Sequence, residues 1–225
     1  MELNHAMRTT FAAREFVDEP VSDNVLYDIL ENARFAPSGG NRQGNRVIIV
    51  RDEARRDALA QYSEPAAKRY VAQLVRGENP WNSVIPTTAT EQEIDETDVP
   101  SILVDSFRSA PVVLVFVVDL KVVASMDQYL SRVGMISGAS IYPFVWNVLL
   151  GARQAGLGGT ITTLAAAKEA DVRTLLNIPE DYAVAAVVPI GKPVKQLTKL
   201  KRKPVAEIAT SESFDGPQFE GPQSS

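Results

Sequence analysis

A run of basic residues near the C-terminal end of the chain has the chemistry to bind an anion. Residues 192–203, KPVKQLTKLKRK, hold six cations and no acidic residue, whereas the whole chain has 28 acidic and 23 basic residues. Proteins that bind nucleic acids usually show the opposite overall balance. A local basic cluster on an acidic protein therefore favours one small anion as its ligand, although a solvated strand end would have the same composition.

Two arginines near the N-terminus, Arg8 and Arg14, add to this chemistry. A guanidinium group binds phosphate with two parallel hydrogen bonds, so these residues together with 192–203 predict a phosphate clamp. Taken alone, the same two arginines are ordinary exposed side chains.

Two glycine-rich segments are candidate pocket walls. Residues 36–43, APSGGNRQ, join two predicted buried elements with short polar side chains and bare backbone, and ordinary turn chemistry explains the same residues. Residues 156–160, GLGGT, lack the lysine of a phosphate-binding loop and run from a helix into a strand, the reverse of a dinucleotide-binding loop. We expect a glycine here to end the helix and to leave room for a flat ligand.

Composition excludes several kinds of catalytic site. The chain has no cysteine, which excludes disulfides, thiolate metal sites and cysteine nucleophiles, and its one histidine is His5. Zinc hydrolase and Ser-His-Asp chemistry would therefore lack a key residue, and we expect no metal site. The N-terminus does not resemble a signal peptide. The uncharged stretch 133–152 is interrupted by Pro143 and polar residues, so we expect no membrane span, and a cytoplasmic location.

The elements that must position these residues follow from apolar periodicity. Helices are predicted over residues 22–36, 53–75, 135–154 and 166–176, and strands over 46–51, 111–119, 159–163 and 183–190. The 135–154 helix should be buried on most sides, in a core or a subunit interface. Residues 77–101 read as a long loop or lid, and residues 204–225 as a polar extension that wraps a partner or frays. The pattern predicts an α+β fold with helices over a central sheet.

Four blocks in this order resemble the FMN-dependent nitroreductases. They are Arg14-Glu15-Phe16 with Pro20-Val21, then Ala36-Pro37-Ser38-Gly39-Gly40-Asn41-Arg42-Gln43, then Ala155-Gly156-Leu157-Gly158-Gly159-Thr160-Ile161-Thr162-Thr163, and finally Ile190-Gly191-Lys192-Pro193 through Lys201-Arg202-Lys203-Pro204. Together the blocks span residues 8–208, nearly the whole chain.

The resemblance implies a single domain over residues 1–225, with a nitroreductase-like central mixed sheet flanked by helices. It also implies an intertwined homodimer with FMN at the subunit interface, and no nucleic-acid or membrane partner. By position, the residues implied at the FMN phosphate are Arg8, Arg14, Lys201 and Arg202. Those implied along the flavin are Pro37, Ser38, Gly39, Asn41 and Gln43, with Thr162 and Thr163 at the N5 and O4 edge.

The activity implied is hydride transfer from NAD(P)H, through flavin N5, to an acceptor such as a nitroaromatic or a quinone. No side chain is implied as a general acid or base, because the cofactor carries the redox chemistry. Alternatives are a flavin-dependent dehalogenase or dehydrogenase, a non-catalytic flavin-binding protein and, outside flavin chemistry, an anion-binding interaction protein. Two positions depart from the pattern: Thr10 replaces an arginine, and Asn45 stands where members carry tryptophan.

Overall fold

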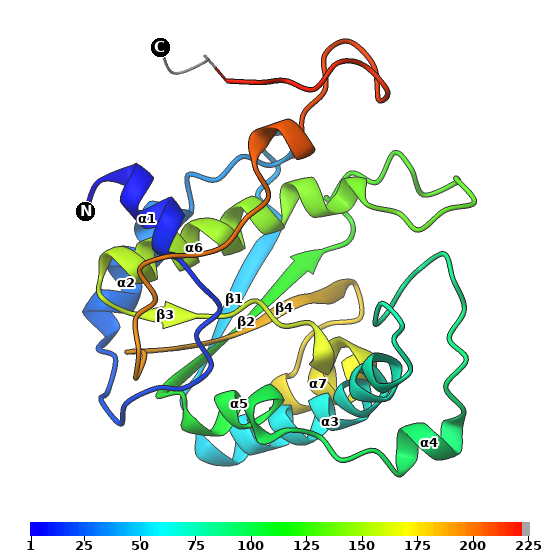
Figure 1. Cartoon of the computed structure of the whole chain (residues 1–225). Coiled ribbons are helices and arrows are strands. Elements are labelled where there is room, and N and C mark those ends of the chain that lie inside the picture. The colour runs from blue at the N-terminus through cyan, green and yellow to red at the C-terminus, as the bar shows by residue number, and fades with distance from the viewer. Residues whose placement is uncertain (222–225) are drawn as a thin grey trace.

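A four-stranded sheet forms the centre of the computed structural model, which describes residues 1–221 (Figure 1). The strands are β1 (Asn45–Val50), β2 (Val112–Asp119), β3 (Gly158–Gly159) and β4 (Tyr182–Gly191). Their order is β1-β2-β4-β3, and all three pairings are antiparallel. An isolated parallel bridge between Ala12 and Gly159 makes the sheet mixed at one edge.

Helices cover both faces of this sheet, which confirms the α+β prediction (Figure 1). Side chains alternate between faces along a strand. Val112, Leu114 and Phe116 of β2 therefore pack against α2 (Asp23–Ala33) and α6 (Tyr142–Gln154). Val113 and Val115 pack on the opposite side, against α3 (Glu53–Val75), α5 (Asp105–Ser109) and α7 (Glu169–Leu176). The short helix α1 (Leu3–Thr9) lies against α6.

The predicted helix over residues 135–154 begins later than expected. A 3₁₀ helix, Ile136–Ser140, precedes α6, which begins at Tyr142 with Pro143 in its first turn, where the fixed φ of proline suits a helix start. Within this chain α6 buries one face: Val145 and Val148 are fully buried, while Trp146 is 40% exposed. None of the helices in residues 1–221 is long and apolar enough to span a bilayer.

Two other predicted elements are shorter than expected. The predicted strand over residues 159–163 is reduced to Gly158–Gly159 and an isolated bridge between Thr162 and Val187. The predicted helix over 166–176 is α7 preceded by a 3₁₀ helix, Leu164–Lys168. The polypeptide between β3 and α7 therefore follows an irregular path, which leaves its side chains free to line a cavity.

The segment 77–101 contains ordered structure. The helix α4 (Glu91–Asp95) begins with a capping box in which Thr90 and Glu93 bond to each other's backbone, and Glu93 also pairs with Arg76. The Glu78 carboxylate accepts hydrogen bonds from Thr87 and Thr88, which lower its pKa to about 2. In the C-terminal extension, a 3₁₀ helix spans Val205–Glu207, and the end of the predicted extension, 222–225, lies outside the described residues.

Candidate functional site

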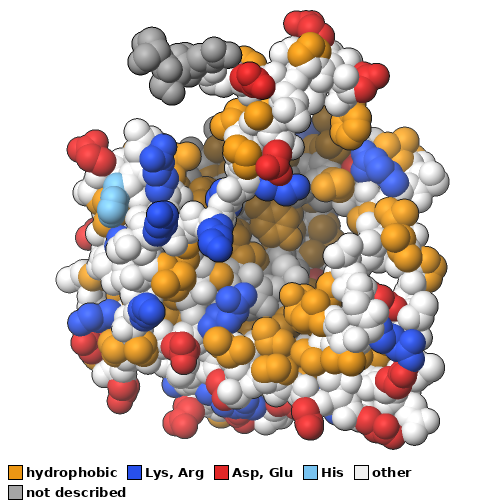
Figure 2. Space-filling model, in the orientation of Figure 1, with side chains coloured by type: hydrophobic (Ala, Val, Ile, Leu, Met, Phe, Trp, Pro, Cys, Tyr) orange, Lys and Arg blue, Asp and Glu red, His pale blue; other side chains and the backbone are white. Residues whose placement is uncertain are grey.

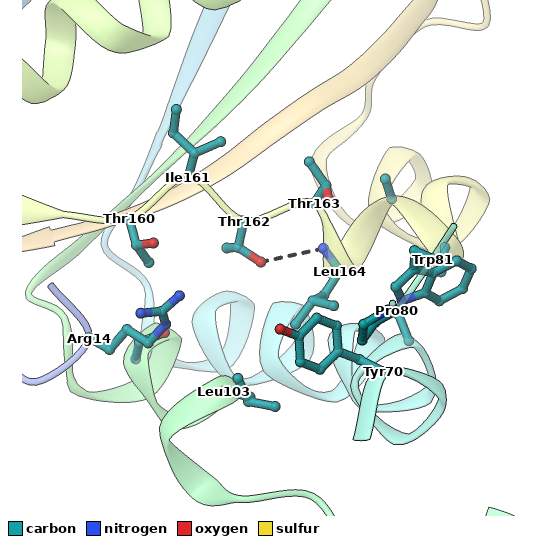
Figure 3. A pocket seen from close by; sticks show the side chains of 14 residues that line it. Arg14, Tyr70, Pro80, Trp81, Leu103, Thr160, Ile161, Thr162, Thr163 and Leu164 are labelled. Atoms are coloured by element: carbon teal, nitrogen blue, oxygen red, sulfur yellow. Dashed lines mark hydrogen bonds between the residues drawn. The ribbon is translucent and has the colours of Figure 1, made fainter. Parts of the chain in front are cut away.

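A cavity of about 520 Å³ lies beside the chain that leaves β3 (Figure 3). This volume falls within the range of about 300–1,000 Å³ that is typical of small-molecule sites. One wall is the continuous run Thr160–Leu164, and other walls come from α3, α5 and the N-terminal segment. The remaining lining residues are Arg14, Ala66, Tyr70, Pro80, Trp81, Leu103, Ser106, Ala166 and Ala167.

The two ends of the cavity differ in chemistry. Figure 3 shows Arg14 at one end, near Thr160, and Tyr70, Pro80 and Trp81 at the other, with Thr162 between them. Arg14 is the one charged side chain among the lining residues that the structure describes. The cavity therefore offers a cationic end, a polar wall and an aromatic end to a single elongated ligand.

Backbone hydrogen bonds position Arg14 at this cavity. The Ala13 N–H donates to the Gly159 carbonyl at 3.1 Å, which fixes the N-terminal segment to the sheet. On the other side of Arg14, the Val194 N–H donates to the Glu15 carbonyl at 3.0 Å, which joins the same segment to the basic stretch. The half-buried Arg14 forms no ion pair within residues 1–221, so its guanidinium has donors available for an anion.

Thr162 and Thr163 occupy the middle of the wall. Thr162 exchanges two backbone hydrogen bonds with Val187 of β4, and its Oγ1 accepts a third from the Leu164 N–H (Figure 3). The neighbouring Thr163 is exposed, and its N–H donates to no acceptor in the described part of the chain. Thr162 is thus a rigid support, and Thr163 offers a donor at the cavity's edge.

The residues of the glycine-rich segment lie elsewhere. Ser38 and Gln43 line a smaller cavity of about 120 Å³ together with Asn45, and Ser38 Oγ accepts from the Gln43 N–H at 3.0 Å. Pro37 and Asn41 are exposed, and the Gly39 N–H donates to Ser140 Oγ at 2.9 Å. The structure therefore brings Arg14, Thr162 and Thr163 together but leaves the 37–43 group at a separate surface of the same chain.

The other predicted phosphate residues also lie outside the large cavity. Arg8, Lys201 and Arg202 are exposed, and Arg202 Nη1 donates to the Lys201 carbonyl at 2.7 Å. Gln196 Nε2 donates to the Thr9 carbonyl at 3.0 Å, which holds the basic stretch against the end of α1. The face of the molecule drawn in Figure 2 has a hollow with several Lys and Arg side chains beside it. Lys192 is already paired with Glu19 at 2.8 Å.

The two positions that depart from the family pattern have structural roles. Thr10 is buried, and its hydroxyl donates to the Ala6 carbonyl at 2.8 Å, so it ends α1 and does not face an anion. Asn45 Nδ2 donates to the Ser140 carbonyl at 2.9 Å, which ties the start of β1 to the 3₁₀ helix before α6. Asn45 Oδ1 is buried without a partner in residues 1–221.

Sequence reasoning missed the aromatic end of the cavity. Tyr70 lies on the predicted helix 53–75 and Trp81 in the predicted loop, and neither belongs to a recognisable motif. A tryptophan in an otherwise polar loop was the available signal for Trp81. Tyr70 offered none, because its direction depends on how α3 packs. Among residues 1–221 no group of acidic or histidine side chains could hold a metal ion.

Known proteins resemble this chain in sequence and in fold. Residues 7–192 match the model of the nitroreductase family. The chain is 24% identical over 207 residues to nitrobenzene nitroreductase of Ectopseudomonas oleovorans, covering 84% of this chain and 86% of that protein.

Two solved structures share the fold. Iodotyrosine deiodinase bound to FMN and 3-iodo-L-tyrosine is 21% identical, with a TM-score of 0.68 over 95% of this chain and all of that one. The NADPH:FMN oxidoreductase of Vibrio harveyi, complexed with NAD+, is 20% identical, with a TM-score of 0.66 over 93% of this chain and 76% of that one. With a family match across most of its length, the chain belongs to the nitroreductase family.

Proposed function

We propose that the protein is an FMN-dependent oxidoreductase that passes a hydride from NAD(P)H to an electrophilic acceptor such as a nitroaromatic or a quinone. The observation that carries the proposal is the cavity with Arg14 at one end and Tyr70, Pro80 and Trp81 at the other. When bound, FMN would supply the redox chemistry through N5 of its ring. The relatives named above include proteins whose structures hold FMN or NAD+.

The residues present suit FMN along this cavity. The Arg14 guanidinium would bind the terminal phosphate, and the exposed Arg8, Lys201 and Arg202 would add positive charge around it. Thr162 and the Thr163 N–H, which has no acceptor within residues 1–221, would face the polar edge of the ring, where a hydrogen-bond donor favours the electron-rich reduced form. The aromatic end of the cavity would then receive the acceptor. We propose that residues 77–101 form a lid over this end of the cavity, with Pro80 and Trp81 as the residues that line it.

We also propose a homodimer in which each FMN contacts both chains. Ser38, Gly39 and Gln43 lie apart from the large cavity of their own chain, so a second copy is the direct way for them to reach a flavin. Exposed apolar side chains at the start and middle of α6, Tyr142 and Trp146, provide surface that a partner would bury.

Steady-state oxidation of NADH and NADPH with nitrobenzene or 1,4-benzoquinone tests the activity. We expect turnover that requires both FMN and an acceptor. A protein that binds FMN but oxidises neither nicotinamide with either acceptor would instead be a flavin-binding protein without this activity. Reduction of halogenated but not nitrated aromatics would favour the dehalogenase alternative.

A further inference from the structure

Trp81 lies in a backbone conformation that tryptophan rarely adopts. Its φ is +56°, in the left-handed region where a bulky side chain is an outlier. Such residues persist only where the surrounding structure fixes them, and they gather at ligand sites and switch regions. The turn around Trp81 should therefore have specific supports, and its side chain a reason to be held there.

The support is the side chain of Gln73 on α3. Gln73 is 3% exposed, and its Oε1 accepts a hydrogen bond from the Trp81 N–H at 3.0 Å. The Gln73 carbonyl accepts another from the Glu78 N–H at 2.9 Å. Both ends of the turn 78–81 are thus attached to one buried residue. Leaving a buried amide oxygen unpaired is costly, so this attachment fixes the position of the turn.

Trp81 remains 48% exposed despite these supports, and its indole is not enclosed in the core. It lines the 520 Å³ cavity and also a neighbouring cavity of about 420 Å³ on the side of α4. The Arg69 guanidinium stacks over the ring, 4.9 Å from its centre, and so sets its orientation. The indole is therefore a fixed partition between two cavities, not a part of the core.

The charge distribution indicates what the partition faces. Arg14, the one charged lining residue that the structure describes, lies at the far end of the cavity, where the proposed function assigns it to phosphate. Within this cavity the aromatic end offers only Tyr70, Pro80 and Trp81, whereas charged side chains such as Glu64 and Arg69 line the neighbouring cavity on the other side of Trp81. An acceptor with an ammonium and a carboxylate group would leave both charges unpaired at the aromatic end.

We propose that Trp81, held in place by Gln73, is a specificity-determining wall of the acceptor site. It selects flat, uncharged aromatic acceptors over those that carry an α-amino acid group. Gln73 is a positioning residue that acts through Trp81. The inference rests on the proposed function, because it places the flavin between Arg14 and the aromatic end.

The test compares 4-nitrotoluene with 4-nitrophenylalanine, which share a reacting group and differ in the amino acid group. We expect the wild type to favour 4-nitrotoluene in kcat/KM by roughly 100-fold. Trp81→Gly removes the indole while glycine tolerates the positive φ, so the turn is kept. This variant should raise KM for 4-nitrotoluene on the order of tenfold, while kcat and FMN affinity stay nearly unchanged. The ratio of kcat/KM for 4-nitrotoluene to that for 4-nitrophenylalanine should become smaller than in the wild type. Ile85→Ala is the control, since Ile85 is exposed in the same segment and lines none of these cavities.

Gln73→Leu should raise KM for 4-nitrotoluene as well, but should add little in a Trp81→Gly background, because its effect passes through the indole. If the KM increases caused by Gln73→Leu and Trp81→Gly add up in the double variant, Gln73 does not act through Trp81 and has only a structural role. The inference would be overturned if Trp81→Gly left KM for 4-nitrotoluene unchanged, or if the wild type reduced both nitroarenes equally well. Neither result would affect quinone reduction or FMN binding, so the proposed function would remain intact. A wild type that binds no FMN would overturn both.

Discussion

The Ala13 N–H donates to the Gly159 carbonyl at 3.1 Å, and this bond joins the N-terminal segment to the edge of the sheet. The two residues are distant in sequence, yet the next residues along each segment, Arg14 and Thr160, line the same cavity. The bond therefore brings a cation to the wall on which the proposed flavin ring would lie. The parallel bridge between Ala12 and Gly159 is part of the same contact.

Arg14→Ala should weaken FMN binding and leave riboflavin, which lacks the phosphate, almost unaffected. A charge-assisted hydrogen bond contributes about 1.5–3 kcal/mol, which corresponds to roughly 10- to 150-fold in affinity. Flavin titration with both ligands measures the difference. Equal loss of FMN and riboflavin would mean that Arg14 supports the cavity and does not bind phosphate.

Arg202→Ala should also weaken FMN selectively if the exposed basic stretch closes over the phosphate on binding. Lys199→Ala is the matched control, because Lys199 is exposed in the same stretch and should affect little beyond salt dependence. Arg8→Ala should give an intermediate loss of FMN affinity if Arg8 supplies the phosphate contact that is missing because Thr10 replaces an arginine. Wild-type FMN affinity in Arg202→Ala would contradict its assignment to the phosphate.

Gly159→Ala should destabilise the fold, because a Cβ at this position would lie 2.6 Å from the Pro189 carbonyl oxygen. Overpacking of this kind typically costs about 1–3 kcal/mol. Gly221→Ala, whose added Cβ would meet no atom of residues 1–221 within 4 Å, is the control. Thermal unfolding of both variants should show a lower Tm for Gly159→Ala alone. An unchanged Tm would mean that the edge strand moves away from β4 without cost.

The Asp127 carboxylate should stabilise the loop before α6 in a pH-dependent manner. Asp127 is 4% exposed and accepts hydrogen bonds from the Met135 N–H at 2.7 Å and from Arg132 at 2.8 Å, which lower its pKa from 3.8 to about 2. A lowered folded-state pKa gives stability that is present above pH 3.8 and is lost as the pH falls toward 2.

Asp127→Asn should therefore lower the Tm at pH 7, and the gap from the wild type should shrink between pH 4 and pH 2. Thermal unfolding at several pH values measures this gap. A gap that stays constant over that range would show that the charge of Asp127 contributes nothing.

Much of the framework is predictable from the sequence. The helix over 53–75 has the predicted bounds, and the apolar run in β2 indicates a strand covered on both faces. Local patterns specify such elements because burial follows periodicity. The break before α6 was not predicted, since an uncharged stretch reads equally as one helix or as two pieces. The turn at Trp81 depends on Gln73, a tertiary contact that no local pattern reveals.

Only part of the candidate site was predicted, because local sequence patterns identify some of its residues and tertiary contacts position the others. Thr162 and Arg14 belong to recognisable blocks, and the structure brings both to one cavity. The block that holds Ser38 and Gln43 is recognisable as well, but the structure places these two residues at a separate, smaller cavity.

A homodimer should be visible by light scattering as a particle of twice the 24.5 kDa chain mass. Trp146→Glu would place a charge on the exposed part of α6 and should shift the equilibrium toward monomer with loss of bound flavin. A wild-type monomer that retains flavin would contradict the shared site.

The central claim is that the cavity between Arg14 and Trp81 binds FMN. The most direct measurement is the visible spectrum of the purified protein, followed by titration of the flavin-free protein with FMN and FAD. We predict a yellow protein that releases FMN on denaturation and rebinds FMN in preference to FAD. A colourless protein that takes up no added FMN would contradict the account.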